Sequence, residues 1–174
     1  MNEIVELLKY SLPAIIVALI VYYAVNQLLE IEKQKREKEM KLLRAKTFLP
    51  LKIQAYERVV LLVERITPEN LIVRVNRGGL SAVQLKTLLT KSIREEYEHN
   101  ISQQIYISPK AWELVKNAKE SMINLVNTAN AGLQGDAGPA DLIRSIFDSY
   151  LAQDPPPLAL ALNYLKMEMQ KEIH

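Results

Sequence analysis

The chain opens with a hydrophobic segment, and its apolar residues then recur at helical spacing to the end. Leu12 to Val25 reads LPAIIVALIVYYAV and has no polar group except two tyrosine hydroxyls. Extended from Tyr10 to Leu29, the segment has 20 residues, and a helix needs about 20 residues to cross the hydrocarbon layer of a membrane. The pattern predicts that residues 1–29 form an N-terminal tail and a transmembrane helix.

Two other interpretations of this segment fit the sequence less well. A signal peptide has a basic start and a small-residue cleavage site, whereas this start carries Glu3 and Glu6 and no A-x-A motif follows the segment closely. A buried core helix would not normally run straight into KQKREKEMKLLRAK. We therefore expect a membrane anchor, with the lipid bilayer as its first partner.

Residues 30–46 are predicted to continue the helix as a charged juxtamembrane stalk. They contain seven Lys or Arg and four Glu, with neither Gly nor Pro, and these charged residues favour helix. Their apolar positions do not keep an a/d heptad, so a coiled coil is not supported. Because basic flanks stay in the cytoplasm, we expect a single-pass protein with its N-terminus outside and residues 30–174 in the cytoplasm.

Residues 47–174 show helical periodicity interrupted by four breaks, at Thr67-Pro68, at 76–79 (NRGG), at 132–139 and at 154–157 (DPPP). Ser81 and Ser108 are typical N-caps, the second followed by a proline. Together these signals predict helices up to Ile66, from Ser81 to about residue 104, over 109–133, over 139–152 and from Leu158. The fold class that we expect is all-α: an anchor helix, a stalk and a compact cytoplasmic helical bundle.

Composition excludes several kinds of chemistry. The chain has no cysteine, so thiol nucleophiles, disulfides and cysteine-bound zinc are absent. Residues 47–174 carry fourteen charges of each sign and give no electrostatic reason to bind nucleic acid. No G-x-G-x-x-G, P-loop, G-x-S-x-G or H-E-x-x-H motif occurs, and we expect no cofactor.

The stretch IREEYEHNISQQIY, residues 93–106, concentrates polar and ionisable groups on a predicted helix. At 100° per residue, Glu96 and Asn100 fall inside the apolar stripe, whereas Glu98 points away from it. An unpaired buried carboxylate is costly, and Arg58 or Arg65 on the preceding helix could supply a guanidinium. We predict a structural polar network between the two helices, formed by Gln54, Glu57, Arg58, Glu96, His99, Asn100 and Gln103.

Three alternatives remain for this stretch. Glu96 and His99 have the E-x-x-H spacing of di-iron bundles, but those sites need two such motifs and further glutamates; a mononuclear site would use Glu96, His99 and Glu57. General acid–base catalysis by His99 with Glu96 is a second alternative, although no nucleophile or oxyanion device accompanies it. A surface-exposed recognition patch is the third. We also expect Trp112, the only tryptophan, to pack against a neighbouring helix.

Three segments together resemble a family of small membrane-anchored proteins of Bacteroidota: LPLKIQAYERVVLLVERI, SIREEYEHNISQQIYIS and LVKNAKESMINLVN. The resemblance covers nearly the whole chain, and EYEHNISQQIY is its most specific part. It implies the architecture above and a bacterial inner membrane, and it transfers no catalytic residues.

We expect a non-enzymatic adaptor or accessory subunit whose cytoplasmic face binds a protein partner in a membrane or cytoplasmic complex, or a second copy of itself. The alternative is a metal-binding protein or enzyme that uses Glu96 and His99.

Overall fold

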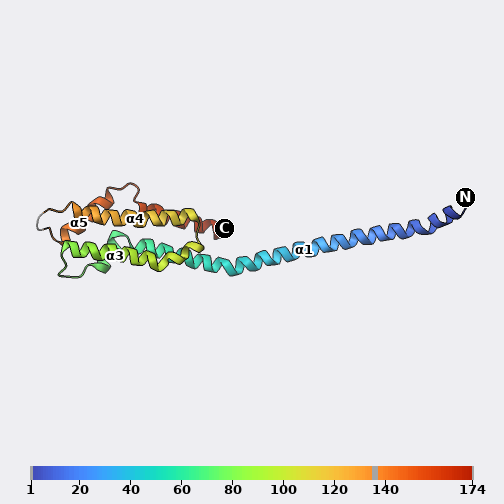
Figure 1. Cartoon of the computed structure of the whole chain (residues 1–174), viewed down its shortest axis with the longest axis horizontal. Coiled ribbons are helices and arrows are strands. Elements are labelled where there is room, and N and C mark those ends of the chain that lie inside the picture. The colour runs from blue at the N-terminus through green and yellow to red at the C-terminus, as the bar shows by residue number, and fades with distance from the viewer. Residues whose placement is uncertain (1, 135–136, 174) are drawn as a thin grey trace. The chain divides into compact units, whose positions relative to one another are not determined.

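A computed structural model describes residues 2–134 and 137–173. Within them the chain forms six α-helices, one 3-10 helix and no strand, so the all-α prediction is confirmed (Figure 1). Of the predicted loop at 132–139, Gly135 and Asp136 lie outside the described residues. The elements are α1 (Asn2–Arg65), α2 (Pro68–Val75), α3 (Ala82–Asn100), η1 (Ile101–Ile105), α4 (Pro109–Ala131), α5 (Pro139–Leu151) and α6 (Pro157–Ile173).

The chain divides into two units, Met1–Leu49 and Pro50–His174. The division lies within α1, at a proline that cannot donate a backbone hydrogen bond to the preceding turn. The first part of α1 therefore belongs to unit 1, and its last part, from Pro50 to Arg65, belongs to unit 2.

Between Leu12 and Leu43, unit 1 is a helix that leaves its apolar side chains uncovered. Every side chain from Leu12 to Leu43 is exposed, including Leu19 at 61% and Tyr23 at 67%. Within the described residues, α1 is the one helix long and apolar enough to cross a membrane. Two polar side chains of this segment bond to each other: the Gln27 side-chain amide donates to the Tyr23 hydroxyl at 3.1 Å.

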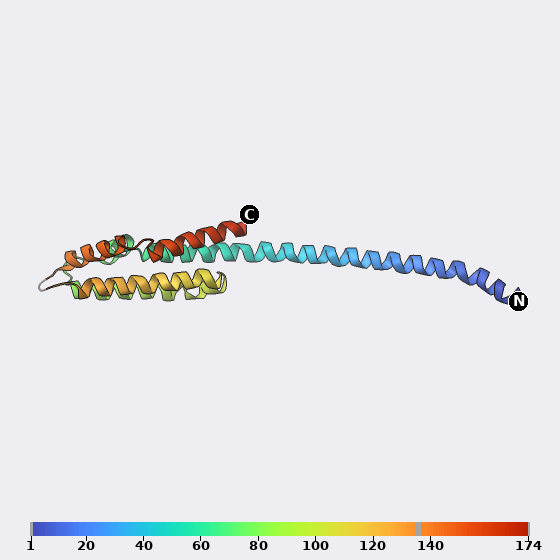
Figure 2. The same ribbon diagram turned by 90° about the horizontal axis from the view of Figure 1, so that it is seen from above.

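Unit 2 is a helical bundle of four columns. The last part of α1, followed by α2, makes the first column, α3 and α4 make the second and third, and α5, followed by α6, makes the fourth (Figure 1; Figure 2). Adjacent columns run antiparallel, with α3 beside α4 and α6 beside both α4 and the last part of α1. The first and fourth columns each consist of two helices, and the second helix of each begins at a proline: Pro68 begins α2 and Pro157 begins α6.

The core of unit 2 follows the predicted apolar stripes. Each column contributes residues at helical spacing that are at most 3% exposed: Ala55, Val59 and Leu62 from α1, with Ile66 directly after it; Leu85, Leu89 and Ile93 from α3; Val115, Ala118, Met122, Val126 and Ala129 from α4; Leu142, Ile146, Leu158 and Leu165 from α5 and α6. Burying a side chain of the Leu or Ile class contributes about 1.5–3 kcal/mol. The bundle is thus held chiefly by this shared apolar interior.

Local signals fix where the helices start. The Ser81 hydroxyl accepts a hydrogen bond from the Gln84 amide at 3.2 Å, and the Gln84 side chain accepts from the Ser81 amide at 2.9 Å, which forms a capping box. The Ser108 hydroxyl caps α4 by accepting from the Ala111 amide at 3.1 Å. Between α2 and α3, Gly79 has φ +82°, a conformation that side chains with a Cβ rarely adopt.

The predicted end of the helix from Ser81, near residue 104, is wrong: α3 ends at Asn100. The Asn100 side-chain amide donates to the Glu96 carbonyl at 2.9 Å, the acceptor that an α-helix reserves for the backbone amide of residue 100. Beyond this point the Ile101 amide bonds to Glu98, three residues back. This change from four-residue to three-residue bonding marks the 3-10 turn η1, which precedes α4.

Candidate functional site

Glu96 lies at the centre of an ion-pair cluster where α1, α2 and α3 meet. Its side chain is 14% exposed. The Arg65 Nε donates to Glu96 Oε2 at 2.8 Å, and the Arg74 Nη1 donates to the same oxygen at 3.3 Å. Two guanidiniums thus pair with this carboxylate, and one of them, Arg65, was a candidate from the sequence.

Both arginines lie in the last turn of their helices, where a positive charge is favoured by the helix dipole. A second Arg74 nitrogen donates to the Arg65 carbonyl at 3.1 Å. That carbonyl has no intrahelical partner because α1 ends at this residue. The cluster therefore holds the junction between α1 and α2 against α3.

Exposure limits what the cluster contributes to stability. The Arg65 and Arg74 side chains are 44% and 34% exposed, so water competes for both guanidiniums. Such pairs contribute less than fully desolvated ones, and their geometric role is to fix the register of neighbouring helices.

The remaining residues of the predicted network are more scattered. The Asn100 side-chain amide donates to the Glu96 backbone carbonyl. The Gln103 amide donates only to the Ser102 hydroxyl, at 3.3 Å. Four other members have no hydrogen bond or ion pair with any residue that the structure describes, and all four are exposed: Gln54, Glu57, Arg58 and His99.

The metal alternative finds little geometric support. Among residues 2–134 and 137–173, no group of three or more His, Asp or Glu side chains is placed to hold a metal ion. Glu96, one proposed ligand, is already held by two guanidiniums, whereas His99 and Glu57 are exposed. The second histidine of the chain, His174, lies outside the described residues.

Three further side-chain contacts join helices of unit 2. The buried Tyr56 hydroxyl donates to Glu168 Oε2 at 2.8 Å and links the last part of α1 to α6. The ring of Tyr97 stacks on Trp112 with centroids 5.2 Å apart, so Trp112 packs on the neighbouring α3 as predicted. Lys119 lies over the same Tyr97 ring, with Nζ 4.4 Å from the centroid.

Among the described residues, the fold shifts the pKa of Tyr150, which lies near the end of α5. Burial raises the pKa of its hydroxyl above the ordinary value of 10.0, and the negative charge of Glu64 on α1 raises the pKa further. Both effects disfavour the phenolate, so this side chain stays a neutral hydroxyl well beyond physiological pH.

An open depression of about 840 Å³ lies over the Glu96 cluster. Arginines from α1 and α2 line one side of it, and polar residues of α3 line the other: Arg58, Arg65, Arg74, Ser92, Glu95, Glu96, Glu98, His99 and Asn100. The depression brings together four residues of the predicted network, Arg58, Glu96, His99 and Asn100, and adds Arg65 and Arg74.

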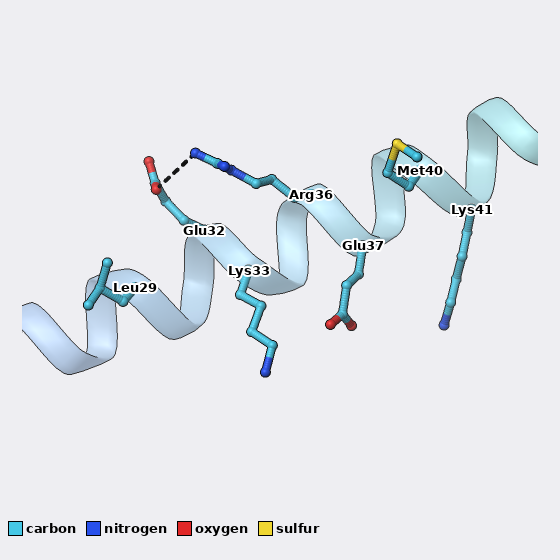
Figure 3. A pocket seen from close by; sticks show the side chains of 7 residues that line it. All are labelled: Leu29, Glu32, Lys33, Arg36, Glu37, Met40 and Lys41. Atoms are coloured by element: carbon cyan, nitrogen blue, oxygen red, sulfur yellow. Dashed lines mark ion pairs between the residues drawn. The ribbon is translucent and has the colours of Figure 1, made fainter.

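A second depression lies on unit 1 and is a feature of helix geometry alone. Figure 3 shows its side chains in two rows along α1, with Glu32 and Arg36 in one row and Lys33, Glu37 and Lys41 in the other. Rows of side chains four residues apart form ridges on any helix, and a groove lies between them. The ion pair between Arg36 and Glu32, 3.7 Å apart, is exposed, with 79% of the Arg36 side chain and 63% of the Glu32 side chain accessible. The groove has no second wall and gives no reason to expect a ligand.

With the geometry described, comparison with known proteins places the chain in a family. Residues 2–172 match the profile of a family of unknown function (DUF7935). The chain belongs to this family. The match covers both units, so the apolar helix and the bundle are features of one family architecture. No curated protein and no solved structure matches the chain, and membership therefore brings no known activity with it.

Proposed function

We propose that the chain is a membrane-anchored helical adaptor: unit 1 crosses a lipid bilayer once, and unit 2 binds a protein partner in the cytoplasm without catalysing a reaction. The observation that carries the proposal is the contrast between the two units. In unit 1 every large apolar side chain from Leu12 to Leu29 is at least 48% exposed, whereas unit 2 buries its apolar stripes in a core of its own.

Exposed apolar area on this scale is unfavourable in water, by about 25 cal/mol per Å². A bilayer removes the penalty, and a helix satisfies its own backbone hydrogen bonds there. The length of the apolar segment supports a single crossing. The seven basic residues of the stalk, against one (Lys9) before the span, support a cytoplasmic location for unit 2.

The adaptor part of the proposal is supported by what the polar groups of unit 2 do. Several of its partly buried polar side chains make contacts that connect helices, as Arg65 does with Glu96 and Tyr56 with Glu168. Among the described residues, no Ser or Thr hydroxyl makes a hydrogen bond to a histidine or a carboxylate, the pairing that activates a hydroxyl nucleophile. A rigid bundle on a tether is suited to presenting a surface to another protein.

The resemblance to membrane-anchored proteins of Bacteroidota supports a bacterial inner membrane as the location, with the N-terminus in the periplasm. Purification of the tagged full-length chain from its native membrane, in a mild detergent, tests the adaptor proposal. We expect a stoichiometric protein partner, or a defined homo-oligomer, that is absent when an unrelated single-pass protein carries the same tag. Recovery of the chain alone, as a monomer, would contradict the proposal.

A further inference from the structure

The depression over Glu96 has guanidinium donors that the fold leaves unused. Arg65 and Arg74 both bond to one oxygen of Glu96, and Arg65 does so through Nε alone. The terminal nitrogens of Arg65 make no hydrogen bond with the residues that the structure describes. Arg58, two helical turns earlier on the same face of α1, likewise has no partner among them.

Unpaired positive charge lies on the α1 side of the depression. The lining has three arginines and three glutamates, so its formal charges balance. Glu96 is bound by Arg65 and Arg74, and Glu95 pairs with Lys91 at 3.6 Å on the exposed surface of α3. Among the described residues, Glu98 on the α3 side has no ion-pair partner, and on the α1 side neither Arg58 nor the terminal nitrogens of Arg65 have one. A carboxylate can therefore pair on the α1 side without displacing a contact of the fold.

Geometry gives the same indication as charge. Because Glu96 holds the Arg65 side chain through Nε, part of the entropy cost of ordering a long side chain is already met before a ligand arrives. Leu61 lies between Arg58 and Arg65 on this face of α1 and is 54% exposed. An acidic side chain next to an apolar one would match this arrangement.

We propose that the depression is a docking site for an acidic segment of the protein partner, with a carboxylate bound between Arg58 and the terminal nitrogens of Arg65. Guanidinium and carboxylate groups pair through two parallel hydrogen bonds, which makes the contact directional. This inference rests on the proposed function, because it assigns the partner surface of the adaptor. It also gives a role to Arg58, which makes no hydrogen bond or ion pair with the residues that the structure describes.

The test is a calorimetric titration of the full-length chain in uncharged detergent at low ionic strength. The probes are an acetylated tetraglutamate amide, the matching tetraglutamine amide and inorganic phosphate. We expect saturable binding of tetraglutamate and none of tetraglutamine. Arg58→Gln should weaken tetraglutamate binding about tenfold, the loss expected when one charged hydrogen-bonding partner is removed.

Arg94→Gln is the matched control. Arg94 is exposed, lies on the face of α3 opposite Glu96 and is not part of the depression. The substitution makes the same change in net charge, so a site-specific effect leaves its affinity within about twofold of wild type. Equal weakening by both substitutions, or no saturable binding of tetraglutamate, overturns the inference. Tighter binding of phosphate than of tetraglutamate overturns the assignment to a carboxylate.

The outcome is separate from that of the proposed function, because the titration needs no natural partner. If a partner is purified and binds Arg58→Gln as tightly as wild type, the docking site is wrong while the adaptor proposal stands. If no partner is found but tetraglutamate binds as described, the site stands and the adaptor proposal fails.

Discussion

Replacing Glu96 by alanine should destabilise unit 2 measurably. The substitution removes the acceptor of two charged hydrogen bonds, at 2.8 and 3.3 Å, and leaves Arg65 and Arg74 facing each other without a carboxylate. Hydrogen bonds to charged groups contribute about 1.5–3 kcal/mol when they are buried. Here the two arginine side chains are 44% and 34% exposed, so water replaces part of what is lost.

This partial exposure places the expected loss at about 1–2 kcal/mol, between the values for buried and surface pairs. In a domain of this size, that loss lowers the melting temperature by roughly 3–8 °C. Glu98→Ala is the control, because Glu98 is two residues away, exposed and without a partner among the described residues. A surface substitution of this kind stays within about 0.5 kcal/mol of wild type.

Trp112 provides the assay. It is the only tryptophan of the chain and stacks on Tyr97, and both side chains are partly buried against the core of unit 2. Its fluorescence therefore follows the unfolding of the bundle in the full-length protein, whatever the apolar helix of unit 1 does in detergent. Urea titrations of wild type, Glu96→Ala and Glu98→Ala give the comparison. Equal midpoints for the two variants would refute the reasoning, since they would show that the Glu96 cluster adds nothing to the bundle.

Two further predictions use the same fluorescence signal. Leu89→Ala should lower the free energy of unfolding by about 2–5 kcal/mol, because Leu89 is 0% exposed. Leu88→Ala should lower it by less than about 1 kcal/mol, because Leu88 is 37% exposed. A larger loss for Leu88→Ala would mean that the α3 register is wrong. The pKa of Tyr150 is raised in the folded state, by burial first and by the charge of Glu64 second. The stability that the neutral Tyr150 hydroxyl contributes is therefore fully present below its unfolded-state pKa, near 10.0, and is lost as pH rises through its folded-state pKa. Tyr150→Phe should therefore lose less stability than wild type between pH 9 and pH 11, roughly the window in which an unperturbed tyrosine ionises, and parallel losses would argue against this assignment.

The helices and their starts could be predicted from sequence because the signals are local. Ser81 and Ser108 cap the helices that follow them, and the apolar stripe of α4 is buried as its spacing indicated. The end of α3 could not be placed, because nothing in the periodicity shows that the Asn100 side chain competes for the Glu96 carbonyl.

The partners of the polar groups depend on tertiary structure and were harder to predict. The break at Thr67-Pro68 was visible in the sequence, but it gave no reason to expect a helix whose last turn brings Arg74 to Glu96. Tyr56 and Glu168 are 112 residues apart, and only the antiparallel arrangement of α1 and α6 brings them together. A basic residue near the end of a short predicted helix is the one signal that could have suggested Arg74.

The central claim is that a lipid-spanning helix holds the bundle on the cytoplasmic side of the membrane. It is tested most directly by fusing two reporters in turn after His174, a phosphatase that is active only in the periplasm and a fluorescent protein that folds only in the cytoplasm. We predict that the fluorescent fusion is bright and remains in the membrane fraction after alkaline extraction, while the phosphatase fusion is inactive. An active phosphatase fusion, or release of the chain by alkaline extraction, would contradict the account.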